Sequence, residues 1–184
     1  PRASGIGGCS REMAYMMLNV DKTNPMRGEG RLTTEQGRVM EDVTVRLFER
    51  ATGGEYVVAN RQVELPEDFE LTGHPDGQIV RREDAAWDST CAECGGEIDD
   101  LEHKLRDHHY RPVGWVAPLD AKVNGRVIGF EHKHLGRYGY ESIAKSDFLQ
   151  AEPGYVAQFC AYGAALGWND VYIVVMSQDS SSVK

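Results

Sequence analysis

Positive charge is scarce in this sequence. The 184 residues include 20 Lys and Arg but 29 Asp and Glu, so the net charge is −9 at pH 7 with His neutral. A protein that coats nucleic acid non-specifically needs clustered Lys and Arg against the phosphates, and the overall charge argues against that class. It leaves open an enzyme whose acidic side chains bind a metal ion while a local basic patch holds a nucleic acid.

Long apolar runs are absent, and cysteine is sparse. No stretch has the length of a membrane span and no signal peptide opens the chain, so we expect no membrane contact. Four cysteines at this length do not form the disulfide framework of a small secreted protein, which favours a reducing cytoplasm. Length and composition fit one globular domain over residues 1–184. The first residue is Pro1 and not Met, which is compatible with a piece of a longer chain.

The order of periodic segments predicts a mixed α/β domain. Val39, Val43 and Leu47 recur at helical spacing and predict a helix over 34–50, and a second helix is expected over 153–167. The remaining expectations are a short helix over 10–18, strand-like segments over 55–65 and 69–80, a hairpin turn at Asn124-Gly125, and a buried strand over 171–176. Residues 81–112 are charged and poor in apolar side chains, and are expected to form an insertion.

The segment "GFEHKH", residues 129–134, carries the sharpest chemical signal. On a strand, Glu131 and Lys133 project from one face while Phe130 and His132 project from the other. A carboxylate and an ammonium on a core strand lose hydration unless they have partners. A simple ion pair between the two side chains explains that pattern, and an E-x-K triplet alone is a weak motif.

Other polar residues in the chain favour a functional role for this pair. Asp76 follows a strand-like segment in "GHPDG", and Glu41 shares a helix stripe with Val45 and Phe48, which predicts that it faces inward. Two carboxylates that converge are what a magnesium ion needs, because magnesium keeps several waters and substrate phosphate as its other ligands. A lysine beside them can orient a metal-bound water and offset phosphate charge.

A second aspartate competes with Asp76 for this role. Asp120 precedes the Asn124-Gly125 turn, so a hairpin there would place it across from Glu131 at a short sequence separation. The "GHPDG" pattern favours Asp76, and the spacing favours Asp120. Both remain candidates.

Five pieces of the chain, taken together and in order, resemble the PD-(D/E)XK nuclease superfamily, and within it the RecB-like, phage-exonuclease-like branch. The pieces are "SGIGGCSR", Glu41 on its helix, "GHPDG", "EHK" and "QFCAY". The resemblance runs from about Ser4 to Met176, with residues 81–112 unmatched. It implies a restriction-endonuclease-like mixed sheet flanked by helices.

The resemblance also implies roles for the site residues. Asp76 and Glu131, with the backbone carbonyl of His132, would bind Mg²⁺ or Mn²⁺, and Asp120 is the alternative to Asp76. Lys133 would position the attacking water, and Glu41 would support the metal shell. Gln158 and Tyr162, four residues apart on one helix, would contact DNA or brace the site.

The implied activity is a metal-dependent DNA nuclease, an exonuclease or DNA-end-processing enzyme of phage or bacterial recombination or repair. Its partners would be DNA and other recombination or packaging proteins, in the cytoplasm of a bacterial or phage-infected cell. The alternative is a catalytically inactive nuclease fold that serves as a DNA-binding or assembly module.

The segment 81–112 carries a possible second metal site. Cys91, Cys94, His103 and His108 have ligand types that suit tetrahedral Zn²⁺, which would fold an insertion that lacks a core. A solvated loop with a chance C-x-x-C is the alternative. Some relatives hold a four-cysteine iron–sulfur cluster, but no Cys follows Cys160, so we expect none in this chain.

Residues 134–147 directly follow the E-x-K triplet and combine cations with aromatic rings. Arg137, Tyr138, Tyr140 and Lys145 have the composition of a groove that holds a DNA strand. A surface loop without a ligand is the alternative interpretation.

Overall fold

The computed structural model of the chain describes residues 28–61, 63–69, 71–90, 114–146 and 148–177, and a few positions nearer the N-terminus. Those positions are Ala3, Ile6, Ala14, Met17 and Leu18. Within the first long helix, side chains are described from Gln36 onwards. The side chain of Leu149 is not described. Most of the helix expected over 10–18 lies outside these residues, as do Cys91, Cys94, His103 and His108, the candidate zinc ligands.

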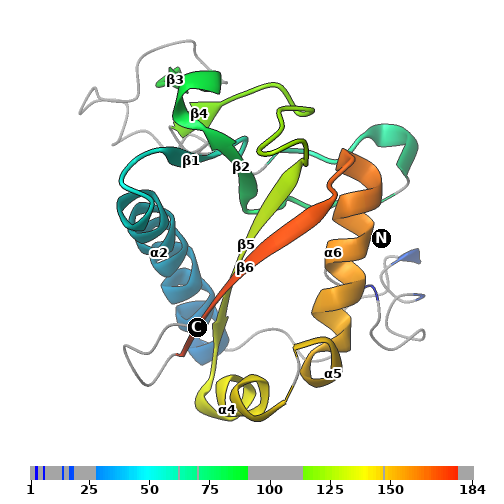
Figure 1. Cartoon of the computed structure of the whole chain (residues 1–184). Coiled ribbons are helices and arrows are strands. Elements are labelled where there is room, and N and C mark those ends of the chain that lie inside the picture. The colour runs from blue at the N-terminus through cyan, green and yellow to red at the C-terminus, as the bar shows by residue number, and fades with distance from the viewer. Residues whose placement is uncertain are drawn as a thin grey trace.

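Six strands within the described residues form one mixed sheet, which confirms the α/β class (Figure 1). They are β1 (Tyr56–Ala59), β2 (Gly77–Arg81), β3 (Ala86–Asp88), β4 (Gly114–Val116), β5 (Ile128–Leu135) and β6 (Asp170–Ser177). Their order across the sheet is β3-β4-β1-β2-β5-β6. β2 runs antiparallel to both β1 and β5, while β5 and β6 are parallel.

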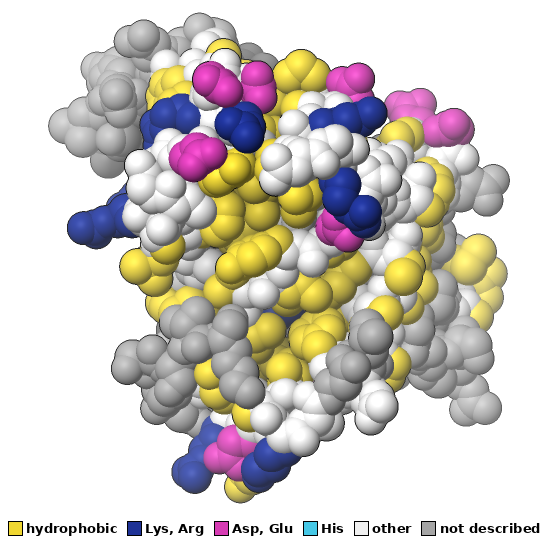
Figure 2. Space-filling model, in the orientation of Figure 1, with side chains coloured by type: hydrophobic (Ala, Val, Ile, Leu, Met, Phe, Trp, Pro, Cys, Tyr) yellow, Lys and Arg dark blue, Asp and Glu magenta, His cyan; other side chains and the backbone are white. Residues whose placement is uncertain are grey.

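Two long helices lie on opposite sides of β5 and β6 (Figure 1). α2 (Gly28–Ala51) packs against β1 and β5, and α6 (Pro153–Leu166) packs against β6. The shorter helices α4 (Arg137–Lys145) and α5 (Phe148–Ala151) connect β5 to α6. In the same view, hydrophobic side chains gather between α2 and α6 (Figure 2). No helix among the described residues is long and apolar enough to cross a membrane.

The helix expected over 34–50 is confirmed, but the side chains of Val39 and Val43, whose spacing predicted it, do not lie on its buried face. Val39 and Val43 are exposed. The opposite stripe is buried instead: Val45 belongs to a core cluster with Phe130 of β5, and Phe48 packs against it. Because Glu41 lies one turn before Val45, the same stripe carries Glu41 to the sheet, as the sequence predicted.

The Asn124-Gly125 turn is confirmed, but the hairpin around it is not. Both residues have positive φ, 51° and 79°, and Val123 and Arg126 exchange two backbone hydrogen bonds of 2.9 and 3.1 Å. The pairing stops there, because β5 pairs with β2 and β6 instead of with the segment before the turn. Asp120 therefore does not lie across from Glu131.

The C-terminal elements agree with expectation in outline. α6 begins at Pro153 and ends before Gly167, whose φ of 70° suits a helix C-cap. β6 is buried in its second half only. Cys160 is exposed on α6, because the buried stripe of this helix runs through Gln158, Phe159 and Tyr162.

The first ten residues of the expected insertion are part of the sheet. Arg81 completes β2, and β3 pairs with β4 through Trp87 and Trp115. These two indole rings meet edge to face at 5.2 Å between centroids, so they pack on each other even though Trp87 is half exposed. Residues 81–90 thus belong to the edge of the sheet.

The close fit of Trp168 against β5 gives a test of the packing. A Cβ at Gly129 would lie 2.1 Å from the Trp168 ring, whereas a Cβ at Gly163 of α6 would meet Trp168 only at an ordinary 3.6 Å. We expect Gly129→Ala to lower the free energy of unfolding by about 2 kcal/mol or more. Gly163→Ala should stabilise by up to about 1 kcal/mol because Ala favours the helix. Urea denaturation measures both, and equal effects would contradict this packing.

Candidate active site

The register of β2 against β5 brings Asp76 to Glu131. Gly77 pairs with Phe130, so the next step of the antiparallel ladder places Asp76 opposite Glu131. The backbone N–H of His132 donates a 2.7 Å hydrogen bond to Oδ2 of Asp76, which fixes the aspartate against β5. The aspartate expected from "GHPDG" therefore lies at the E-x-K strand.

Gly77 is required for this close approach. Its φ is 151°, a backbone conformation that residues with a side chain rarely adopt. A Cβ at this position would lie only 2.4 Å from Cγ1 of Val58, so a larger residue would force the neighbouring atoms to shift. The glycine after Asp76 thus lets β2 start close to β1, and the aspartate lies at the point where the strand begins.

Glu131 and Lys133 project together from one face of β5, as strand alternation predicted. Nζ of Lys133 donates a 2.8 Å hydrogen bond to Oε2 of Glu131, whose side chain is only 1% exposed. Oε1 of Glu131 is buried and has no hydrogen-bond partner. The rings of Tyr155 and Phe159 on α6 each lie 5.4 Å from Nζ. These cation–π contacts hold the ammonium in place beside the carboxylate.

The two carboxylates oppose each other's ionisation. Burial and then the charge of Glu131 raise the pKa of Asp76 to about 7, although Lys133 and the His132 N–H bond act in the other direction. Burial also raises the pKa of Glu131, opposed chiefly by Lys133. A buried pair of carboxylates with one ammonium lacks positive charge, which a cation would supply.

Glu41 approaches Asp76 and Glu131 from α2, and these three carboxylates are called the acidic cluster below. Burial and the charge of Asp76 raise its pKa, while the Arg61 guanidinium lowers it. Nη2 of Arg61 lies 2.7 Å from Oε1 of Glu41 and 2.7 Å from Oδ1 of Asp42. Arg61 is therefore the counter-ion that holds Glu41 in its inward position.

Gln158 and Tyr162 are brought together as predicted, in a bracing position. Nε2 of Gln158 donates a 2.9 Å hydrogen bond to the hydroxyl oxygen of Tyr162, and both side chains are buried. A Cβ at Gly73 would lie 3.0 Å from that same hydroxyl. The pair thus packs against the loop that carries Asp76, and its contact with DNA stays a prediction.

His132 lies on the opposite face of β5, toward α2. Its Nδ1 is 3.0 Å from Oγ1 of Thr44, and burial lowers its pKa to about 4. Its backbone N–H contacts Asp76, as described above; a metal-binding role for its carbonyl stays a prediction.

Asp120 and the residues expected to bind DNA lie on other segments of the chain. Asp120 is exposed in the loop before Val123. The segment after the E-x-K strand is not a loop: residues 137–145 form α4, on which Tyr138 is 87% exposed and Tyr140 is half-buried. Arg137 and Lys145 of this helix both pair with Glu141, at 2.8 and 3.5 Å.

The arrangement of Asp76 and Glu131 suits a hard divalent cation. No group of three or more His, Cys, Asp and Glu side chains within the described residues is spaced to enclose a metal ion. Magnesium does not need such a cage, because one or two carboxylates with water and phosphate suffice. The unpartnered Oε1 of Glu131 is a buried anionic oxygen without a donor, and a cation would satisfy it.

The raised pKa of Asp76 predicts a pH-dependent cost in stability without added metal. Between about pH 4 and 7 the unfolded chain ionises this carboxyl while the native state keeps its proton, so native stability falls as pH rises. Asp76→Asn removes this cost and retains an oxygen acceptor for His132. We expect its stability relative to wild type to rise by on the order of 4 kcal/mol across that range and to level off above it. Urea denaturation in EDTA measures this difference, and a pH-independent difference would contradict it.

Three residues of the site were not identified from the sequence. Arg61 follows β1 in a segment with no recognisable motif, so no local signal pointed to it. Tyr155 and Phe159 had a usable signal, since they share the helical stripe of Gln158 and Tyr162.

Comparison with known proteins adds no relative. No family model matches the chain, and neither curated proteins nor solved structures give a match.

Proposed function

We propose that this protein is a divalent-metal-dependent nuclease that hydrolyses phosphodiester bonds in DNA on a restriction-endonuclease-like fold. The observation that carries the proposal is the convergence of Asp76, Glu131 and Lys133 at the start of β2 and the middle of β5. Two carboxylates and a lysine at one point are the groups that metal-assisted phosphate hydrolysis requires. The mixed sheet with helices on both sides supports the fold assignment.

Asp76 and Glu131 would hold the ion, Mg²⁺ or Mn²⁺, through their carboxylate oxygens. When bound, the ion would lower the pKa of a coordinated water and offset the charge that develops on the phosphate. The unpartnered Oε1 of Glu131 is available for this role without breaking a hydrogen bond. Glu41, held by Arg61, supplies a third negative charge next to Asp76.

Lys133 is placed to act on the attacking water and on the phosphate. Its Nζ is held between Glu131 and the rings of Tyr155 and Phe159, so the ammonium is fixed before substrate arrives. A pre-positioned cation costs little reorganisation during the reaction. Burial lowers the lysine's pKa while Glu131 and Asp76 raise it, and the net direction is upward, so the side chain is cationic at neutral pH.

A path for DNA is available on the helix that follows β5. α4 begins two residues after β5 ends and exposes Arg137, Tyr138 and Lys145. Cations beside an aromatic ring are the usual elements of single-strand binding surfaces. This placement favours contact with a strand whose scissile phosphate lies at Glu131.

A cleavage assay tests the proposal. Labelled linear duplex, circular duplex and single-stranded DNA are incubated with the protein in Mg²⁺ or in EDTA. We expect cleavage of at least one substrate in Mg²⁺ and none in EDTA. DNA binding without cleavage of any substrate would overturn the proposal in favour of an inactive nuclease fold.

A further inference from the structure

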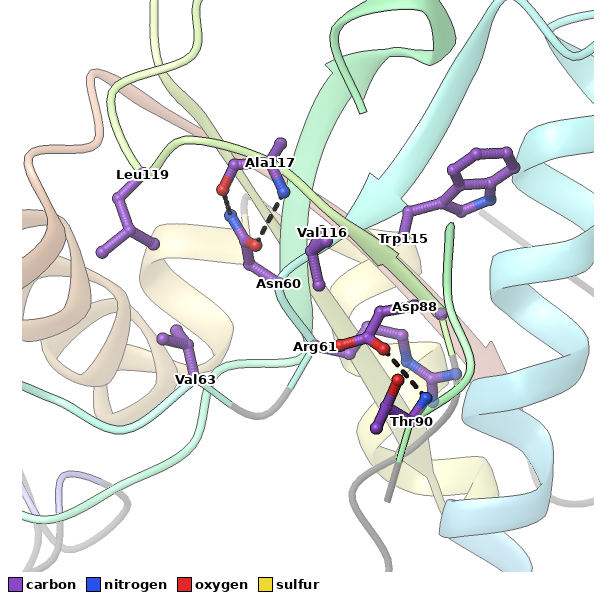
Figure 3. Close-up of a pocket in the computed structure, with 10 residues that line it drawn as sticks. Asn60, Arg61, Val63, Asp88, Thr90, Trp115, Val116, Ala117 and Leu119 are labelled. Atoms are coloured by element: carbon purple, nitrogen blue, oxygen red, sulfur yellow. Dashed lines mark hydrogen bonds between the residues drawn. The ribbon is translucent and has the colours of Figure 1, made fainter. Parts of the chain in front are cut away.

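A pocket of about 240 Å³ lies next to the acidic cluster, between the end of β1 and strands β3 and β4 (Figure 3). Its apolar lining includes Val63, Val116 and Leu119, and its polar lining includes Arg61, Asp88 and Thr90. The volume is below the range of about 300–1,000 Å³ that holds drug-sized ligands, so it suits one small ring system.

The back wall of this pocket is rigid because Asn60 ties two parts of the sheet together. Nδ2 of Asn60 donates to the carbonyl of Ala117 at 3.0 Å, and its Oδ1 accepts from the Ala117 N–H at 3.1 Å (Figure 3). Nδ2 also donates to Oε1 of Gln78 at 3.1 Å. The Asn60 backbone N–H also donates to the Trp115 carbonyl at 2.9 Å. The amide group is fully used in these bonds, so Asn60 shapes the pocket and leaves recognition to its neighbours.

Arg61 connects the pocket to the candidate active site. Its side chain lines the pocket, and its guanidinium pairs with Glu41. Its Cγ would lie 3.4 Å from a Cβ at Gly77, the residue after Asp76. The pocket and the metal-binding carboxylates are therefore separated by one side chain.

The chemistry of the pocket fits a neutral planar ring. Glu41 and Asp42 already neutralise the guanidinium, which leaves little attraction for a phosphate. The side chains of Val63, Val116 and Leu119 offer apolar faces for the ring (Figure 3).

We propose that this pocket binds one nucleobase of the nucleic acid whose phosphate lies at Asp76 and Glu131. The inference rests on the proposed nuclease function and names a base-binding subsite for it. One base held beside the metal centre would fix the register of the strand and make cleavage depend on the identity of that base.

Calorimetric titration with the four deoxynucleoside 5′-monophosphates in Mg²⁺ tests this subsite, with deoxyribose 5-phosphate as a probe that lacks a base. We expect at least one nucleotide to bind more tightly than the sugar phosphate. Leu119→Trp should fill the pocket and weaken that nucleotide by about tenfold or more while leaving the sugar phosphate unchanged. Leu47→Trp on α2 is the matched control, because Leu47 is 47% exposed and Leu119 is 45% exposed.

Val116→Trp, with Val39→Trp as its control, repeats the test if Leu119→Trp lowers the melting temperature. Nucleotides that bind no better than deoxyribose 5-phosphate would overturn the subsite, as would unchanged binding in both pocket variants. The titration needs no cleavage, so the two proposals fail separately. Cleavage without base-dependent binding removes only the pocket, and base-dependent binding without cleavage removes only the nuclease function.

Discussion

Lys133→Gln should reduce DNA cleavage by about 10²–10³-fold, the range expected when one group that stabilises charge in the transition state is lost. The glutamine side chain can still donate a hydrogen bond to Oε2 of Glu131, but it lacks the positive charge that acts on water and phosphate. Initial rates on labelled DNA in saturating Mg²⁺ measure the effect, and circular dichroism with a thermal melt verifies that the variant folds.

Glutamine is a better replacement than alanine because Glu131 is 1% exposed and Lys133 is its partner at 2.8 Å. Lys133→Ala would leave a buried carboxylate unpaired, at a cost of about 3–5 kcal/mol, and would mix loss of folding with loss of chemistry. Lys122→Gln is the matched control, since Lys122 is exposed and lies outside the cluster. Full activity of a folded Lys133→Gln variant would remove the basis of the mechanism.

Asp76→Asn should lower cleavage by at least about 100-fold, whereas Asp120→Asn should leave it within about twofold of wild type. Loss of residues that only support metal ligands costs about 10–100-fold, and a direct ligand should cost at least as much. The two substitutions remove the same charge from two loops, so the comparison of their cleavage rates isolates the effect of where the aspartate lies. Rates across a Mg²⁺ titration also show whether the Asp76 variant can be rescued at high metal concentration.

Equal losses in the two variants would indicate that overall charge, and not ligand geometry, sets the activity. A large loss in Asp120→Asn alone would move the metal site to the loop before Val123, which the pairing of β5 with β2 argues against.

The site residues on β5 could be predicted because strand alternation is a local property. Glu131 and Lys133 share a face whatever the partner strands are. Strand pairing is not local, and this explains the competition between Asp76 and Asp120. The Asn124-Gly125 turn forms as expected, yet β2 takes the place beside β5 that a hairpin would have given to the segment before the turn.

The long helix α2 shows a similar division between what the sequence reveals and what packing decides. Its helical character followed from spacing, but two stripes satisfied the same period. Packing selected the stripe of Glu41, Val45 and Phe48 because Phe130 and the acidic cluster lie on that side. Arg61 could not be predicted at all, because its role depends on residues of α2 and β2 that meet only in the folded chain.

The most direct measurement of the central claim is manganese binding by the wild-type protein and the Asp76→Asn, Glu131→Gln and Asp120→Asn variants. Electron paramagnetic resonance of free Mn²⁺ gives the bound fraction without turnover. The structure predicts binding in the wild-type and Asp120→Asn proteins that is lost or strongly weakened in Asp76→Asn and in Glu131→Gln. Equal Mn²⁺ affinity in all four proteins would contradict the assignment of Asp76 and Glu131 as the metal ligands.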